Sequence, residues 1–122
     1  MRKIGVISKE IVDLLQLNID PDTPILIGDS NISHIKNRHE YEYDKYFQCL
    51  PDIIREPDYV GLSPKDNSIQ YVKEFIIDSE YIRVAVKVTR NNKCFVKTLH
   101  LLSTCNTERY IQKGTLKKLD KK

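Results

Sequence analysis

The sequence contains no tryptophan, only four glycines and three cysteines, and no long hydrophobic run. No segment approaches the roughly 20 apolar residues of a membrane-spanning helix, and the first ten residues lack the apolar core of a signal peptide. Cys49, Cys94 and Cys105 form no CxxC pair and no zinc-ligand cluster with histidine. We therefore expect a cytoplasmic protein with reduced, buried cysteines, no membrane association, no cofactor and no metal.

Length and charge are more informative. A chain of 122 residues can bury one hydrophobic core, and no repeat or linker divides it, so we expect a single domain over residues 1–122. Residues 40–58 carry six acids and two bases, whereas residues 59–118 carry five acids and eleven bases. This basic half suits a polyanionic partner such as RNA, although charged runs are also common on ordinary solvated surfaces.

The spacing of apolar residues changes along the chain from a helical period to a strand period. Helices are predicted near residues 8–17, 31–39 and 46–54, with short strands at 3–7 and 24–27. In the third helical segment, Pro51 must either begin a second helix or kink the first. Further strands are predicted at 59–62, 69–76, 81–89 and 93–101, followed by a helical turn at 107–113. Helices followed by an antiparallel meander predict the α+β class.

The last two long strands can be paired from the sequence. A two-residue loop at Asn91–Asn92 makes one face apolar except for Lys97, with the members Ile82, Val84, Val86, Val88, Phe95, Leu99 and Leu101. The opposite face is polar and basic, and it holds Arg83, Ala85, Lys87 and Thr89 beside Cys94, Val96, Thr98 and His100. An ordinary solvated face would look the same, and a one-residue slip would exchange the two faces.

The loop at 77–80 decides which side chains of the strand at 69–76 lie on each face of the sheet. An even-length loop places Tyr71 and Lys73 on the apolar face, whereas a bulge turns both residues to the polar face. Because a lysine between Tyr71 and Phe75 fits poorly in a core, we favour the bulge.

Three histidines are candidates for proton transfer near neutral pH. His34 and His39 belong to the segment SNISHIKNRHEYEYDKY, and His100 lies on the polar sheet face. At about 100° per residue, His34 and His39 cannot serve one site from one straight helix. Either the helix ends before His39, or only one of the two is catalytic. A purely structural role is an alternative for each histidine.

Six sequence blocks occur in a recognisable order: ISHIKNRH (32–39), IIREPDYVG (53–61), SPKD (63–66), SIQYVKEF (68–75), IRVAVKV (82–88) and FVKTLH (95–100). Over about residues 25–116, the chain resembles the phage-borne barnase–EndoU–colicin E5/D–RelE-like nucleases. The resemblance implies N-terminal helices packed on a curved antiparallel sheet of about four strands, with metal-independent RNA cleavage across that sheet. It points to His34, His39, Lys73, Lys87 and Thr98 as catalytic residues.

RNA cleavage by its own 2′-hydroxyl requires a base, an acid and a cation near the phosphate. We expect Arg83 and His100 to bind substrate on the polar face, and Tyr59 or Tyr71 to stack on a base. RNA is then the partner, and a cognate inhibitor or immunity protein is expected if the chain is a phage-derived toxin or effector. The alternative hypothesis is a non-catalytic RNA-binding or protein-interaction module on the same scaffold.

Overall fold

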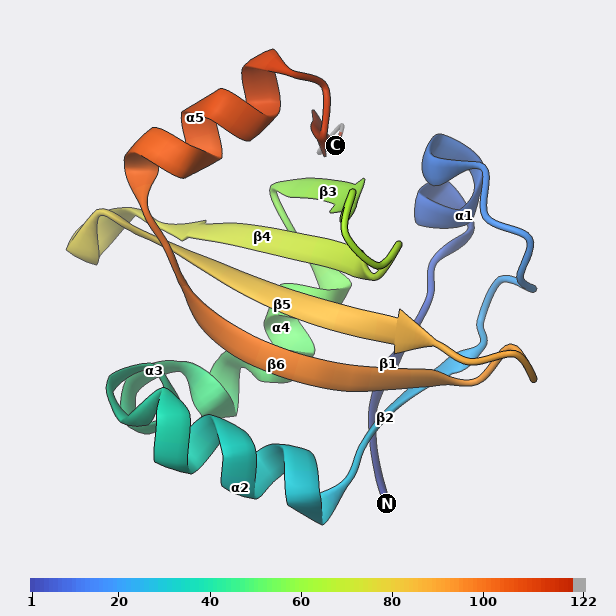
Figure 1. Ribbon diagram of the computed structural model, residues 1–122, viewed down its shortest axis with the longest axis horizontal. Coiled ribbons are helices and arrows are strands. Elements are labelled where there is room, and N and C mark those ends of the chain that lie inside the picture. Colours follow the sequence, from blue (N-terminus) through green and yellow to red (C-terminus); the bar gives the residue numbers. More distant parts are fainter. Residues whose placement is uncertain (120–122) are drawn as a thin grey trace.

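A seven-stranded sheet organises residues 1–119, which are the residues that the computed structural model describes (Figure 1). The strands, in the spatial order β1-β2-β6-β5-β4-β3-β7, are Arg2–Val6 (β1), Pro24–Ile27 (β2), Tyr59–Leu62 (β3), Ile69–Phe75 (β4), Glu80–Val88 (β5), Cys94–Leu102 (β6) and Leu116–Lys118 (β7). The helices are Lys9–Leu15 (α1), Asp29–Arg38 (α2), Glu40–Tyr46 (α3), Leu50–Arg55 (α4) and Thr104–Gln112 (α5), with 3₁₀ turns at Phe47–Cys49 (η1) and Ile76–Asp78 (η2). Over the described part of the chain, every helix is too short or too polar to cross a bilayer.

The α+β class is confirmed, but the sheet is larger than the four strands predicted. The predicted meander forms β3 to β6. β7 adds to β3, and β2 pairs in parallel with β6 through Ile25–Cys94 and Leu26–Phe95. The sheet is therefore mixed rather than antiparallel. Because β2 and β6 are far apart in the chain, local periodicity contains no signal for their pairing.

One face of the sheet packs on α4 and α1 to form the main core. Leu50, Ile53 and Ile54 of α4 are buried against sheet residues that include Ile82 and Val84. Pro51 lies in the first turn of α4. Backbone N–H groups there have no partner within the helix, so the missing N–H of proline costs no hydrogen bond. In Figure 1, α4 lies behind the sheet, and the near side of β4, β5 and β6 is uncovered between α5 and α2.

A smaller cluster beneath α5 covers one end of the second face. Val72, Leu102 and Leu116 are buried there, with Tyr59, Tyr81, Tyr110 and Ile111 packed around them. Gly61 permits the close approach of the chain after α5, because a Cβ at this position would lie 1.8 Å from the carbonyl oxygen of Thr115. The covering helix thus leaves only part of the polar face open.

The β5–β6 hairpin differs from the prediction at its tip. Thr89 N–H donates to Lys93 O at 2.9 Å, and Asn92 has a φ of 59°, so the loop has three residues rather than two. The longer loop shifts the register by one, so Cys94 and Val96 are buried and Phe95 pairs with Lys87 on the polar face. A bulge at Lys97 then restores the register, because Ala85 pairs with Thr98 but Val86 pairs with Val96.

The predicted bulge before β5 is wrong. Ile69 pairs with Val86, Tyr71 with Val84 and Lys73 with Ile82, in unbroken register. Tyr71 is fully buried in the main core. Lys73 also belongs to the core face, but its long side chain reaches the rim and its Nζ donates to Glu56 O at 2.8 Å, just after α4. A lysine on this face is therefore compatible with the core.

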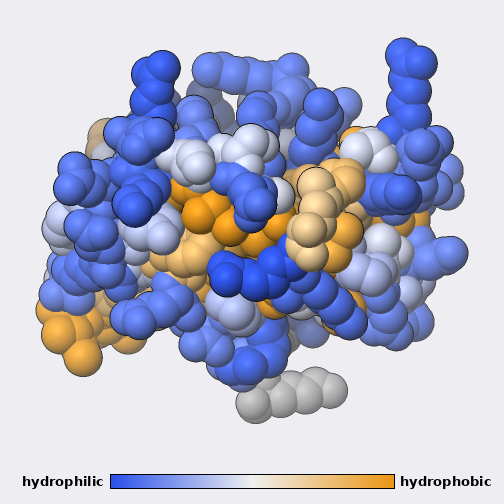
Figure 2. Space-filling view, turned by 90° about the horizontal axis from the view of Figure 1, so that it is seen from below, coloured by the Kyte–Doolittle hydropathy of each residue, from blue (hydrophilic) through white to orange (hydrophobic). Residues whose placement is uncertain are grey.

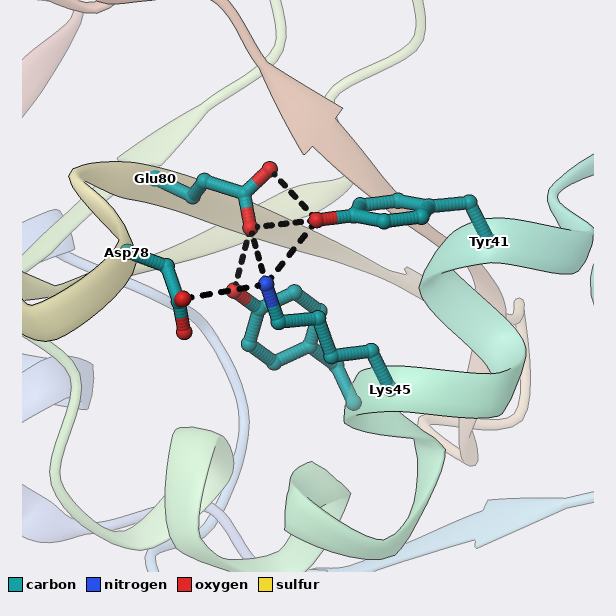
Figure 3. Close-up of polar contacts among 5 residues, drawn as sticks. Tyr41, Lys45, Asp78 and Glu80 are labelled. Atoms are coloured by element: carbon teal, nitrogen blue, oxygen red, sulfur yellow. Dashed lines mark hydrogen bonds and ion pairs between the residues drawn. The ribbon is translucent and has the colours of Figure 1, made fainter.

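A polar cluster fixes α3 against the start of β5 (Figure 3). Glu80 accepts hydrogen bonds from Tyr46 Oη at 2.6 Å, Lys45 Nζ at 2.9 Å and Tyr41 Oη at 2.9 Å, and Lys45 also lies 3.3 Å from Asp78. The hydrogen bond from Tyr46 is the main reason why the pKa of the Glu80 carboxyl is lowered. These contacts hold the helix that begins directly after His39.

The surface on the side of α2 and α3 is mostly hydrophilic, with a central hydrophobic band (Figure 2). Over residues 1–119, the exposed large hydrophobic residues are Met1, Tyr41, Ile76, Ile77 and Leu101. None of them lines the pocket described below. The cysteines are free, and burial raises the pKa of the Cys94 thiol to about 11. Cys105 is exposed, contrary to the expected burial.

Candidate active site

The structure brings the chain's three histidines together. Helix α2 ends at Arg38, and His39 adopts a non-helical conformation (φ −134°, ψ 55°) before α3 begins. The ring centroids of His34 and His39 are 6.1 Å apart, and those of His39 and His100 are 5.3 Å apart in a stacked arrangement. Of the two alternatives left by the sequence, the helix ends before His39. One straight helix could not have made this contact.

Arg83 links the histidines to the centre of the polar face. Its Nε and Nη2 atoms lie 3.2 Å and 3.0 Å from Nε2 of His100, and its Nη1 donates to Oε1 of Gln70 at 3.2 Å. Across residues 1–119, no carboxylate forms a salt bridge with Arg83. The half-buried guanidinium is thus held by two neutral acceptors, and its positive charge is left uncompensated.

His100 is arranged as an acceptor for Arg83. Its Nδ1 lies 3.1 Å from Leu101 O, which fits a neutral ring with the proton on Nδ1 and a lone pair on Nε2. Burial lowers the pKa of His100, and the adjacent Arg83 lowers it further. Both effects favour the neutral ring.

Glu42 joins α3 to β6 beside the histidines. Its Oε2 accepts a hydrogen bond from Leu101 N–H at 2.9 Å and lies 3.7 Å from His39 Nδ1. The Glu42 side chain is 13% exposed. The sequence analysis missed this residue, although its position three residues after His39 places it one helical turn away.

A pocket of about 220 Å³ lies on the polar face beside Arg83. Its floor is formed by Gln70, Arg83, Ala85, Thr98 and His100, while Tyr110 of α5 and the loop between β3 and β4 form its sides. The Thr98 hydroxyl is buried without a hydrogen-bond partner. A buried polar atom of this kind is destabilising unless a ligand or water satisfies it.

The rim of the pocket contains an ion pair. Lys97, the bulged residue of β6, donates to Asp66 Oδ2 at 2.7 Å, and Asp66 Oδ1 accepts from Ser68 N–H at 3.0 Å. The hydrogen bond from Lys97 is the largest of the causes that lower the pKa of Asp66 well below its usual range. Asp66 therefore stays ionised at neutral pH and neutralises Lys97.

The predicted site residues fall into three groups. His34, His39, Arg83, Thr98 and His100 lie together, and Lys87 is farther along the same face in a neighbouring hollow. Tyr59 packs in the cluster beneath α5. Lys73 and Tyr71 belong to the opposite face, so the prediction that they join the site is corrected by the β4–β5 register.

Besides Glu42, the sequence analysis missed Gln70 and Tyr110. The predicted bulge placed Gln70 on the face opposite the site, whereas the observed register places it on the polar face. Tyr110 comes from a helix whose sequence pattern does not connect it to the sheet. Within residues 1–119, no group of three or more histidine, cysteine, aspartate or glutamate side chains has a geometry that could hold a metal ion.

Comparison with known proteins gives one match. Residues 2–113 match the model of a family described as phage-Barnase-EndoU-ColicinE5/D-RelE like nuclease3. No curated protein and no solved structure matches the chain significantly. The family match covers nearly all of the chain, including the three histidines, Arg83 and the pocket.

Proposed function

Since the chain belongs to the phage-Barnase-EndoU-ColicinE5/D-RelE like nuclease3 family, we propose that it is a metal-independent endoribonuclease. One observation carries the proposal: the adjacent rings of His34 and His39 are joined through His100 to Arg83, whose charge has no carboxylate partner within the described chain. A phosphodiester supplies the missing anion beside two imidazoles. RNA also carries its own nucleophile in the 2′-hydroxyl.

The reaction needs no group beyond those side chains. The 2′-oxygen forms a bond to the adjacent phosphorus while its proton passes to one imidazole of the His34–His39 pair. The bond to the 5′-oxygen breaks as that oxygen takes a proton from the other imidazole. The products are a 2′,3′-cyclic phosphate and a 5′-hydroxyl. Each acid–base group typically contributes about 10²–10⁴-fold to the rate.

Arg83 stabilises the charge that develops on the phosphate oxygens, and His100 fixes the direction of its guanidinium. A well-placed donor of this kind is worth about 3–4 kcal/mol of transition-state stabilisation. The unpartnered hydroxyl of Thr98 donates to a phosphate oxygen beside Arg83. Lys87 lies four residues along β5, about 13 Å away at 3.3 Å per residue, and it binds a neighbouring phosphate.

The direct test is incubation of the protein with RNA in EDTA, followed by end-group analysis. Cleavage to 2′,3′-cyclic phosphate ends is expected, and the double variant His34→Ala, His39→Ala should lose it without losing its fold. Lys36→Ala, an exposed change on the same helix, should cleave normally and serves as the control. Salt-sensitive RNA binding without these products would instead support a non-catalytic module and reject the nuclease.

The same proposal includes a cytoplasmic role as a phage-derived toxin or effector, with a cognate inhibitor as protein partner. Its support is the phage nuclease family to which the chain belongs. Expression of the wild type should then reduce host growth, and the double histidine variant should relieve this effect. Equal growth with both proteins would contradict a toxic role.

A further inference from the structure

The floor of the pocket is hollowed by a small residue next to Arg83. Ala85 pairs with Gln70 of β4 and with Thr98 of β6, so its methyl group lies between two longer polar side chains. The pocket volume of about 220 Å³ is below the roughly 300–1,000 Å³ usual for ligand pockets. A space of this size suits one flat group rather than a whole nucleotide.

Gln70 supplies a hydrogen-bond donor with a fixed direction at the floor of the pocket. The residue is only 4% exposed. Its Oε1 accepts from Arg83 Nη1 at 3.2 Å, so the amide NH₂ is the end of the group that remains for a ligand. Across residues 1–119, no protein acceptor bonds to this NH₂. The NH₂ group can therefore donate to an acceptor of a ligand in the pocket.

Tyr110 adds an aromatic wall. Its ring lines the pocket from α5, and the guanidinium carbon of Arg109 lies 5.5 Å from the ring centroid. Nucleobases stack favourably on aromatic side chains. We expected Tyr59 or Tyr71 to stack on a base, but neither residue lines the pocket, whereas Tyr110 does.

The charged groups of the pocket lie mainly at its rim, whereas its floor is mostly neutral. Lys97 at the rim is neutralised by Asp66, whose carboxylate also lines the pocket, whereas Lys65 lines the rim without a salt bridge among residues 1–119. Beyond Arg83 and Thr98, which face the phosphate in the proposed reaction, the floor offers the amide of Gln70, the methyl group of Ala85 and the neutral imidazole of His100. This combination suits a neutral, flat ligand with hydrogen-bond acceptors.

We propose that the hollow over Ala85 binds the nucleobase next to the cleaved phosphate, with Gln70 donating to an acceptor of the base and Tyr110 flanking its ring. This site rests on the proposed function, which places the phosphate at Arg83. It makes Gln70, Ala85 and Tyr110 the residues that determine base preference.

The test compares the binding of inorganic phosphate, ribose 5-phosphate and the four nucleoside 3′-monophosphates by calorimetry. At least one nucleotide should bind tenfold or more tightly than ribose 5-phosphate. Ala85→Val fills the hollow with a residue that favours strands, and Tyr110→Leu removes the ring but keeps an apolar side chain. Both should bring nucleotide affinity within about twofold of ribose 5-phosphate and leave phosphate affinity unchanged.

Tyr110→Phe keeps the ring and should behave as the wild type. Equal binding of all six probes to the wild type, or wild-type nucleotide affinity in folded Ala85→Val and Tyr110→Leu, would overturn the base site. RNA cleavage is measured separately. Base discrimination without cleavage would reject the proposed reaction and leave the base site standing, whereas cleavage with no base discrimination would reject the base site alone.

Discussion

His39 and His100 stack with their ring centroids 5.3 Å apart and their planes at 25°, although one residue links two helices and the other lies on β6. His100 also accepts from Arg83 through Nε2 and contacts Leu101 O through Nδ1. Protonation of His100 would place a second cation against Arg83 and remove the acceptor that holds it. His100 thus connects His39, which we propose transfers protons, to Arg83, which we propose binds the phosphate.

His100 should make the protein less stable in mild acid. Because burial and Arg83 lower its folded pKa, the unfolded chain binds the proton more readily. The free energy of unfolding should therefore be highest above the ordinary histidine pKa of about 6.5 and fall as the pH drops below it. Nearby Glu42 opposes this effect weakly.

Urea unfolding at pH 7.5 and pH 5.5 measures this loss, at about 1.4 kcal/mol per unit of pKa difference. His100→Gln keeps an acceptor for Arg83 but cannot titrate, so its stability should change less between the two pH values. An identical pH dependence in the wild type and His100→Gln would contradict the assignment.

Glu42 should act through His39 rather than through substrate binding. Glu42→Ala removes the oxygen that accepts from Leu101 N–H and faces His39 Nδ1. Misplacement of a catalytic group by about 1 Å can cost about 10²-fold in rate, and we expect a loss of up to this size in kcat, with KM nearly unchanged. Glu42→Gln keeps an acceptor and should recover part of the activity. Glu40→Gln, exposed on the same helix, is the control, and a loss confined to KM would show that Glu42 contacts RNA instead.

The polar cluster at Glu80 should contribute to stability mainly through its buried hydroxyl. Tyr46 is 2% exposed and donates to Glu80 at 2.6 Å, so Tyr46→Phe should lower the free energy of unfolding by about 1–2 kcal/mol. Tyr41 donates to the same carboxylate but is 52% exposed, so Tyr41→Phe should change it by less than about 0.5 kcal/mol. Chemical unfolding compares the two variants, and equal losses would refute the dependence on burial.

Gly61 should be intolerant of any side chain. The Cβ of Gly61→Ala would lie 1.8 Å from Thr115 O, so either β3 or the chain after α5 must move. We expect a loss of about 3 kcal/mol or more, at the upper end for overpacking. At Gly28, the nearest atom to an added Cβ is the flexible end of Met1 at 3.2 Å. Gly28→Ala should therefore lose less than about 1 kcal/mol, and similar melting temperatures for the two variants would contradict the close approach.

The spacing of apolar residues predicted much of the fold, because it indicates which face of each helix or strand is buried. The change from helical to strand period located the meander. The pairs Val84–Leu99 and Ile82–Leu101 are as predicted, although the predicted loop was one residue too short. The bulge at Lys97 compensates for the longer loop, and therefore Arg83, Thr98 and His100 share a face as expected. The facing of β4 was wrong because the sequence does not show that Lys73 can reach a carbonyl at the rim.

The sequence by itself determined the α+β class, the basic sheet face and the candidates His34, His39, Arg83 and Thr98, because periodicity and side-chain chemistry are local properties. Only the tertiary structure decided that α2 stops before His39, that Glu42 reaches Leu101 and that Gln70 and Tyr110 enclose a pocket over Ala85. These relationships depend on where a helix ends and on how distant segments pack, and neither is encoded in the spacing of neighbouring residues.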